Sequence, residues 1–308
     1  MPFHLNSVSR RNFLGTAAIA SIAPTIPAFA ANDSETQTWA LIADTHIDAD
    51  PEKEARGTNM VKNLKQVVAE ITAEKDSIAG VIIDGDIAFN EGLHGDYDTF
   101  VSVIGELARS GMPLHMTLGN HDDRGVFREC FADHTSPAPV MIEKHVSIIE
   151  TPMANWILLD SLRFVNKVEG EIGEKQMKWL TGLLDANPDK PAIIVGHHYP
   201  QVFREDVIPG DKKIKISGLV DSEAFLKALA DRTQAKAYIF GHSHTWNVEQ
   251  DETGLHRINL PPSAYLFDPK LPNGWVKASI SKTGMDLELR AIDTAHAEHG
   301  KKTSLAWR

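Results

Sequence analysis

Five clusters of metal-ligating side chains follow five apolar segments in this chain of 308 residues. The clusters are Asp44-Thr45-His46, Gly85-Asp86, Gly119-Asn120-His121-Asp122, Gly196-His197-His198 and Gly241-His242-Ser243-His244. Imidazole combined with carboxylate oxygen suits iron, manganese or zinc, and the clusters contain no cysteine that would indicate a structural zinc site. Residues two apart in an extended segment point to the same side, so the first and last clusters each offer a ligand pair. Two such pairs with shared groups can hold two ions about 3.5–4 Å apart, which form a clamp for in-line displacement at phosphorus.

The apolar segments that precede the clusters alternate with helical patterns. Short buried strands are predicted at Trp39–Ala43, Ile78–Ile83, Leu114–Leu118, Ala192–Val195 and Ala237–Phe240. Apolar residues at helical spacing predict helices at Met60–Lys75, Phe100–Leu107, Glu174–Leu184 and Ser222–Leu229. This alternation predicts an α/β architecture with its polar groups at the carboxyl ends of the strands, where open sheets bind ligands.

The remaining segments predict further strands. Two are expected between Val146 and Leu162, and antiparallel strands are expected at His256–Leu260, Trp275–Ile280 and Met285–Ile292. The polar end of the chain, from Ala295 to Arg308, is expected to be loosely held.

The composition is that of a soluble globular protein, with 42% hydrophobic and 24% charged residues. The net charge of −11 becomes −13 for a chain that starts at residue 31, because the first 30 residues carry only Arg10 and Arg11 as charges. Such a charge repels nucleic acid backbones, so nucleic acid is not the expected partner and a nuclease is disfavoured. Cys130 is the only cysteine, which excludes an intramolecular disulfide.

The first 30 residues have the order of a secretory signal. Arg10-Arg11 precede Phe13-Leu14 and a mild apolar stretch that ends in Ala28-Phe29-Ala30, a small-x-small cleavage pattern. The paired arginines resemble the twin-arginine signal of bacterial export. We therefore expect a signal peptide at residues 1–30, a single domain at residues 31–308, the twin-arginine export machinery as a partner, and a periplasmic or secreted location. Two prolines and two threonines make the stretch a poor membrane-spanning helix, so no stable membrane anchor is expected.

In this order, the five clusters resemble the motifs of the calcineurin-like metallophosphoesterase superfamily, over residues 39–250. The resemblance implies a four-layer αββα sandwich and two transition metal ions. It implies that one ion is held by Asp44, His46 and His244, and the other by Asn120, His242 and a histidine of the Gly196-His197-His198 cluster. It gives Asp86 the bridging position.

Two positions refine this resemblance. The central histidine ligand of the superfamily usually lies two residues before a proline, and Pro200 then selects His198, whereas the register from Gly196 selects His197 as the alternate. Purple acid phosphatases have glycine and a metal-binding tyrosine where this chain has His46 and Phe89. The chain therefore looks more like the class III cyclic-nucleotide phosphodiesterase and glycerophosphodiesterase branch.

The predicted activity is hydrolysis of a phosphodiester or phosphomonoester bond of a small substrate by a metal-bridging hydroxide. His121 is expected to protonate the leaving oxygen or to bind the phosphoryl group. Asp122 is expected either to orient His121 or to cap the helix that begins near Arg124. The alternative is a noncatalytic metal-dependent protein that binds a phosphorylated ligand. The other histidines are interpreted as structural: His94, His115, His134, His145, His256, His296 and His299.

Overall fold

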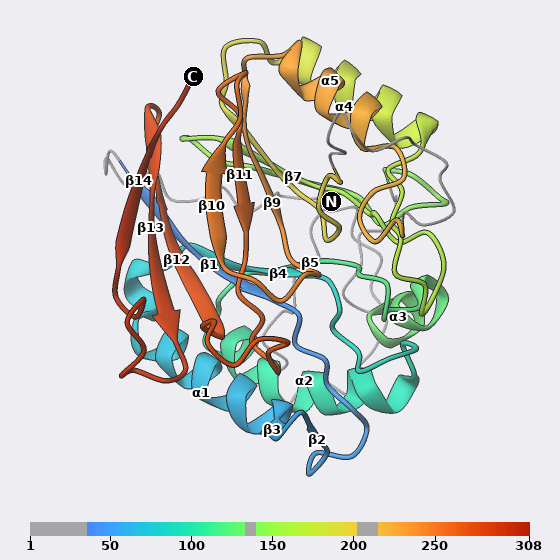
Figure 1. Ribbon diagram of the computed structural model, residues 1–308, viewed down its shortest axis with the longest axis vertical. Helices are drawn as coiled ribbons and strands as arrows, with labels where there is room; N and C mark the ends of the chain where they lie inside the picture. The colour runs from blue at the N-terminus through green and yellow to red at the C-terminus, as the bar shows by residue number, and fades with distance from the viewer. Residues whose placement is uncertain (1–35, 133–139, 202–214) are drawn as a thin grey trace, which may run out of the picture.

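The computed structural model describes residues 36–132, 140–201 and 215–308, which form four layers in the order helix, sheet, sheet, helix (Figure 1). Helices α1 and α2 cover the outer face of one sheet, and α4 and α5 cover the outer face of the other. The predicted αββα sandwich is therefore confirmed.

Each sheet contains six strands among the described residues. The first sheet has the order β14 (Lys302–Ala306), β13 (Gly284–Ala291), β12 (Gly274–Ile280), β1 (Gln37–Ala43), β4 (Gly80–Asp84) and β5 (Leu114–Thr117). The second has the order β10 (Asn247–Gln250), β11 (His256–Asn259), β9 (Ala235–Phe240), β8 (Ala192–Val195), β7 (Asn155–Leu158) and β6 (Ser147–Glu150). A two-stranded hairpin is formed by β2 (Glu54–Ala55) and β3 (Thr58–Asn59).

The helices connect the strands and bury one apolar face each. They are α1 (Met60–Ala73), α2 (His94–Arg109), α3 (Arg124–Cys130), α4 (Glu174–Ala186) and α5 (Ser222–Ala230), with a short 3₁₀ turn at Lys75–Ser77. Helix α1 begins where the side chain of Asn59 accepts a hydrogen bond from the backbone N–H of Lys62. Its buried residues recur at helical spacing and pack on the first sheet.

Strand β1 lies between two cores because its side chains alternate between the two faces of the sheet. Ala40 and Ile42 face the helices, whereas Trp39 and Leu41 face the second sheet. There Trp39 meets Trp156 of β7 with ring centroids 5.5 Å apart. A strand that is buried on both faces needs apolar residues at consecutive positions, and this continuous apolar run is the pattern that predicted β1.

The central strands of each sheet run parallel. In the first sheet β1, β4 and β5 are parallel neighbours, and in the second β7, β8, β9 and β11 are. The carboxyl ends of the parallel strands carry the five polar clusters. The topology therefore brings side chains from distant parts of the sequence to one end of the sandwich.

Two expectations about the fold are corrected. The polar end of the chain is not loosely held: β14 pairs with β13, and the Arg308 guanidinium donates to the carbonyl oxygens of Ala235, Thr253, Leu229 and Arg232. Strand β11 is antiparallel only to β10, since it runs parallel to β9. The predicted signal peptide lies outside the described residues. Within them, no helix combines the length and the apolar character that crossing a membrane requires.

Candidate metal centre

The predicted ligands meet at the carboxyl ends of the parallel strands. Asp44 and His46 follow β1, Asp86 follows β4, Asn120 follows β5, His197 and His198 follow β8, and His242 and His244 follow β9. All of them except His242 are buried, and His242 is partly buried. The two sheets thus contribute to one site at the end of the sandwich.

The backbone at this site is strained where the ligands sit. Five of the predicted ligands have a positive φ in the left-handed region, at 51° for Asp44, 45° for His46, 44° for Asp86, 67° for His242 and 54° for His244. A residue with a side chain is disfavoured there by on the order of 1–3 kcal/mol. The rest of the fold therefore imposes these conformations, and each one turns a side chain out of its strand into the site.

Glycines next to the ligands allow the strand-end loops to come together. A Cβ atom on Gly119 would overlap the carboxylate and backbone N of Asp86, and a Cβ atom on Gly241 would overlap the carboxylate of Asp44. Only glycine permits these approaches.

Asp44, His46 and His244 form the first ligand cluster. One ligand atom from each lies within 4.8 Å of the other two. The Nε2 atoms of the two histidines are 3.0 Å apart, and Asp44 Oδ1 is 3.6 Å from His244 Nε2. The Nδ1 atoms of His46 and His244 bond the carbonyl oxygens of Phe89 and Tyr265. Because a carbonyl oxygen only accepts, Nδ1 carries the hydrogen and each Nε2 presents a lone pair to the cluster.

Asp86, His197 and His242 form the second ligand cluster, by the same 4.8 Å criterion. Here the outward ring nitrogens are His197 Nδ1, which bonds the Asp84 carbonyl oxygen at 3.2 Å, and His242 Nε2, which bonds the Ser217 carbonyl oxygen at 2.7 Å. The inward atom His242 Nδ1 is buried and has no hydrogen-bond partner among the described residues, whereas the inward atom His197 Nε2 faces the Asp86 carboxylate. Asn120 Oδ1 is also buried without such a partner.

Asp86 belongs to the second cluster and also faces the first. Its Oδ2 atom is 3.6 Å from His46 Nε2 and 3.2 Å from His197 Nε2, while its Oδ1 accepts from the backbone N–H of His121 at 2.8 Å. A single carboxylate therefore faces a nitrogen ligand of each cluster, which is the position that a bridging ligand requires.

The electrostatics of the site suit cations. Burial lowers the pKa of His242 to about 3 and that of His244 to about 4, so both rings are neutral, as metal binding requires. Burial also opposes a charge on His197, but the nearby carboxylates of Asp86, Asp44 and Asp84 outweigh it and raise the pKa of His197 to about 10. These carboxylates stabilise a positive charge between them. The stabilisation of positive charge by these carboxylates, together with the unpartnered buried acceptors Asn120 Oδ1 and His242 Nδ1, shows that the residues fit a pair of metal ions.

His198, which the spacing to Pro200 selected, and His197, the alternate, both present a buried ring nitrogen at this end of the sandwich. Both rings are fully buried, and the ring centroids of His198 and His242 are 4.6 Å apart. His198 Nδ1 lies 2.7 Å from the Ser161 hydroxyl, and its Nε2 is buried with no hydrogen-bond partner among the described residues. Of the pair, His197 is the one that shares a three-residue cluster with Asp86 and His242.

The expected roles of Asp122 are corrected. Its carboxylate accepts from the backbone N–H groups of Ile87, Ala88 and Gly119, and from the Tyr97 hydroxyl. It orients neither His121 nor α3, whose N-cap is Asp123. Burial raises the pKa of Asp122 to about 6. Asp122 is therefore a positioning residue that fastens the loop after β4 to the loop after β5.

His121 lies at the opening of the site. Its ring is partly exposed, its Nδ1 lies 2.8 Å from the Asn90 carbonyl oxygen, and its ring centroid is 5.2 Å from that of His46. One of its nitrogens lies within 4.8 Å of ligand atoms of His46 and Asp86. The predicted catalytic histidine thus stands beside the ligands, with a hydrogen-bond partner that sequence reasoning did not name.

Sequence reasoning missed the groups that hold the ligands. The carbonyl oxygens of Phe89, Tyr265 and Ser217 have no sequence signal, since every residue carries one. Asp84 could have been found, because it is a second acidic residue at the end of the same strand as Asp86. Its Oδ1 accepts from the Thr117 hydroxyl at 2.7 Å beneath the site.

The histidines interpreted as structural lie away from the clusters where the structure describes them. His94 pairs with Glu129 at the surface, His145 bonds the Met116 carbonyl oxygen, and His256 bonds the Ala306 carbonyl oxygen. His134 lies outside the described residues.

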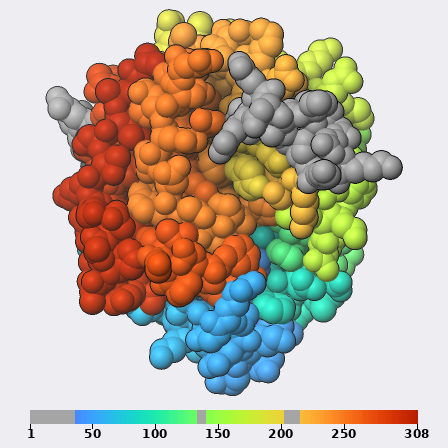
Figure 2. Space-filling view, in the orientation of Figure 1, coloured from blue at the N-terminus to red at the C-terminus, as the bar shows by residue number. Residues whose placement is uncertain are grey.

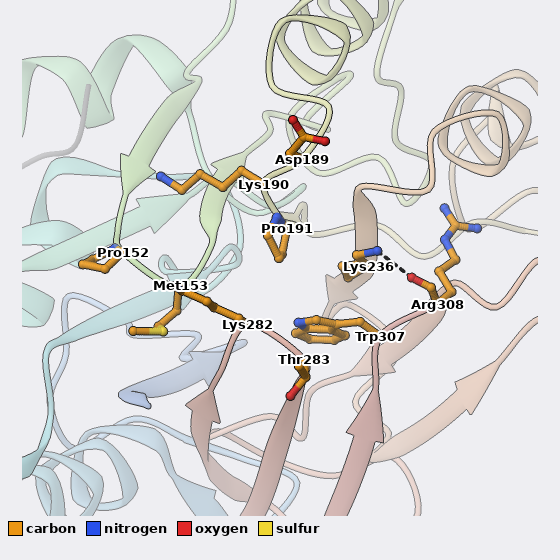
Figure 3. Close-up of a pocket in the computed structure, with 10 residues that line it drawn as sticks. All are labelled: Pro152, Met153, Asp189, Lys190, Pro191, Lys236, Lys282, Thr283, Trp307 and Arg308. Atoms are coloured by element: carbon orange, nitrogen blue, oxygen red, sulfur yellow. Dashed lines mark hydrogen bonds between the residues drawn. The ribbon is translucent and has the colours of Figure 1, made fainter. Parts of the chain in front are cut away.

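A separate pocket lies at the opposite ends of the parallel strands (Figure 3). It has a volume of about 580 Å³, and Met153, Pro191, Lys236 and Trp307 are among its lining residues. Pro191 comes directly before β8 and Lys236 lies at the start of β9, whereas the metal ligands follow these strands. The pocket is therefore not part of the candidate metal centre.

Known proteins resemble this chain in sequence and in fold. A probable cyclic nucleotide phosphodiesterase of Synechococcus sp. is 27% identical over 258 residues, which cover 82% of this chain and 91% of that protein. A 3′,5′-cyclic adenosine monophosphate phosphodiesterase of Haemophilus influenzae is 25% identical, covering 82% of this chain and 89% of that protein. A dimetal phosphatase from Danio rerio has the same fold, with a TM-score of 0.66 and 17% identity over 88% of this chain and 99% of that one.

The αββα sandwich and its two adjoining Asp/His clusters define a metal-dependent phosphoric ester hydrolase. The sequence profile of the calcineurin-like phosphoesterases matches residues 38–246, and the chain belongs to this family.

Proposed function

We propose that the chain hydrolyses a phosphodiester bond of a small substrate with two metal ions. The observation that carries this proposal is the position of Asp86 between two ligand clusters that each contain inward-facing nitrogen atoms. The relatives named as cyclic nucleotide phosphodiesterases support a diester over a monoester. Asp44, His46 and His244 would hold one ion, Asn120, His197 and His242 the other, and Asp86 both.

When bound, the two ions would neutralise charge on the phosphate oxygens and lower the pKa of water. The protein fixes the ligand geometry, since backbone carbonyl oxygens hold the outer nitrogens of His46, His197, His242 and His244. Burial of His46, His197 and His244 excludes bulk water from their ligand atoms. Metal identity depends on loading as well as on ligands, and iron, manganese and zinc all suit this donor set.

His121 would act on the leaving group. The Asn90 carbonyl oxygen accepts from its Nδ1–H, so Nε2 is the ring nitrogen that would pass a proton to the departing ester oxygen. The partial exposure of His121 gives a substrate access to this ring.

Hydrolysis of bis(p-nitrophenyl) phosphate by metal-loaded protein tests the proposal. We expect turnover by the natural chain and a kcat about 100- to 10,000-fold lower in His121→Ala, with metal content unchanged. His94→Ala is the matched control, because its ring pairs with Glu129 at the surface. No turnover by the metal-loaded natural chain would overturn the function, and loss of metal from His121→Ala would overturn the role of His121.

We further propose that residues 1–30 direct twin-arginine export to the periplasm or the medium. The support is the sequence pattern of Arg10-Arg11, Phe13-Leu14 and Ala28-Phe29-Ala30. Replacing both arginines with lysine should retain the protein in the cytoplasm of a bacterial host. Equal export of the natural and double-lysine chains would contradict the proposal.

A further inference from the structure

A strained hairpin holds Arg56 beside the metal centre. The β2–β3 hairpin closes with the two-residue turn Arg56-Gly57, in which Arg56 has φ 50° and Gly57 has φ 77°. A two-residue turn with positive φ at both positions normally takes Asn, Asp or Gly at the first one. An arginine there is locally unfavourable, and such strain clusters at functional positions.

The Arg56 side chain lies over two aromatic rings. Its guanidinium carbon is 4.9 Å from the centroid of Phe267 and 6.0 Å from that of Tyr265. Phe267 stacks in turn on the ligand His244, with ring centroids 4.4 Å apart and an interplanar angle of 25°. Figure 2 shows the blue hairpin segment against the orange segment that carries these aromatic residues.

The segment that carries Phe267 is fixed to the metal centre. The backbone N–H groups of Ser263 and Ala264 donate to the carbonyl oxygens of Ala43 and Asp44 at the end of β1. Phe267 is nevertheless 53% exposed, a large apolar ring left open to solvent next to a buried ligand. We call Arg56, Tyr265 and Phe267 the aromatic rim. The rim is therefore held in place beside the metal centre while an aromatic face stays open to solvent.

Arg56 retains its hydrogen-bonding capacity. In the described part of the chain, its guanidinium has no hydrogen bond or ion pair, although its carbon lies over the Phe267 ring. A planar cation on an exposed aromatic ring stacks with flat ring systems and donates to their acceptor edges. A ring-free ester group has no flat face for this stacking.

We propose that the aromatic rim binds the base of a nucleoside phosphodiester, so that the substrate class is a nucleotide diester rather than a glycerophosphodiester. This inference rests on the proposed phosphodiesterase function. With the phosphate at the metal centre, the base lies against the rim on the side of the centre that carries His244. There Phe267 and Arg56 provide the stacking surface.

Steady-state kinetics on two diesters test the proposal: 3′,5′-cyclic AMP, which has a flat base, and glycerophosphoethanolamine, which has none. The natural chain should prefer the cyclic nucleotide. Phe267→Leu and Arg56→Ala should each raise KM for the cyclic nucleotide about 5- to 150-fold, the range of one lost stacking contact, with little change in kcat. Hydrolysis of the ring-free diester should not change.

Further variants separate stacking from charge and from structure. Arg56→Lys keeps the charge without the plane, and should remain impaired on the cyclic nucleotide. Lys282→Ala is the control, because this exposed cation lines the pocket at the opposite end of the strands, and its KM should equal that of the natural chain. Calorimetry with AMP should show weaker binding to metal-loaded Phe267→Leu than to the natural chain.

The outcomes distinguish failure of the base-binding proposal from failure of the proposed phosphodiesterase function. Hydrolysis of neither diester by the natural chain would overturn both. Preference for glycerophosphoethanolamine, or an equal loss on both diesters in the rim variants, would overturn the base-binding rim and leave the phosphodiesterase in place. Full restoration by Arg56→Lys would show a charge contact only, and would also overturn the proposed stacking.

Discussion

At the scale of single residues, two adjacent histidines differ in what their rings contact. His197 has a backbone carbonyl oxygen on Nδ1 and Asp86 3.2 Å from Nε2, whereas His198 has the Ser161 hydroxyl on Nδ1. The same strand end thus offers two buried imidazole rings, of which His197 faces Asp86. Sequence spacing could not separate them, because both residues follow β8 and both are fully buried.

Alanine substitutions of the two histidines test this difference. His197→Ala should lose one metal ion per chain and most of the activity, since it removes a ligand of the second cluster. His198→Ala should keep both ions, with activity reduced about 10- to 100-fold through looser positioning of His242. Elemental analysis of the purified variants gives the answer. Loss of a metal ion from His198→Ala but not from His197→Ala would reverse the assignment.

Asp122 makes a second prediction at this scale. Its two carboxylate oxygens accept four hydrogen bonds, three of them from backbone N–H groups. Asp122→Asn places an N–H₂ group against some of these donors and should lower the free energy of unfolding by roughly 2–3 kcal/mol. Urea denaturation measures the change. Tyr97→Phe, which removes one of the four bonds, should cost about 1 kcal/mol. Equal stability of Asp122→Asn and the natural chain would contradict the fastening role.

At the scale of elements, the end of β5 depends on glycine. Gly119→Ala would push a methyl group into the Asp86 carboxylate and should abolish metal binding at the bridged site. Gly182→Ala is the matched control, since a Cβ atom at this position of α4 meets no atom within 4 Å. The control should gain about 0.5–1 kcal/mol in stability from its higher helix propensity. Metal content and thermal unfolding are the two measurements. Full metal occupancy in Gly119→Ala would contradict the close approach of these loops.

The elements that the sequence predicts are those whose burial follows a clear pattern, continuous or periodic. Strand β8 is buried at all four positions and was predicted from Ala192 to Val195, as observed. Strand β14 escaped prediction because only Leu305 of its five residues is buried, and its pairing with β13 depends on the backbone. The Arg56-Gly57 turn was not predicted because arginine is not a typical residue at the first position of such a turn. The site was predicted in large part because strand ends and metal-ligating residue types coincide.

At the scale of the molecule, stability should depend on pH through buried neutral histidines. Burial lowers the pKa of His145 from its ordinary 6.5 to about 4. A lowered pKa means that the folded chain binds this proton less readily than the unfolded chain. Stability is therefore present above pH 6.5 and is lost as the pH falls through about 4, by up to roughly 3 kcal/mol.

His145→Gln isolates this contribution, because an amide can still donate to the Met116 carbonyl oxygen. Unfolding free energies of the two chains should be compared from pH 7 to pH 4. The natural chain should lose more stability than His145→Gln over this range. Parallel curves would show that His145 does not titrate with folding.

The whole sandwich serves to bring ligands from both sheets to one end, and the central claim is that they bind two ions that act together. The most direct measurement is a titration of chelator-treated protein with Mn²⁺, which records bound metal and diester hydrolysis in the same samples, for the natural chain and for Asp86→Asn. We predict two ions per natural chain, activity that rises only as the second ion binds, and weakened binding of both ions in Asp86→Asn. Full hydrolysis by the metal-free chain, or maximal hydrolysis with one bound ion, would contradict the account.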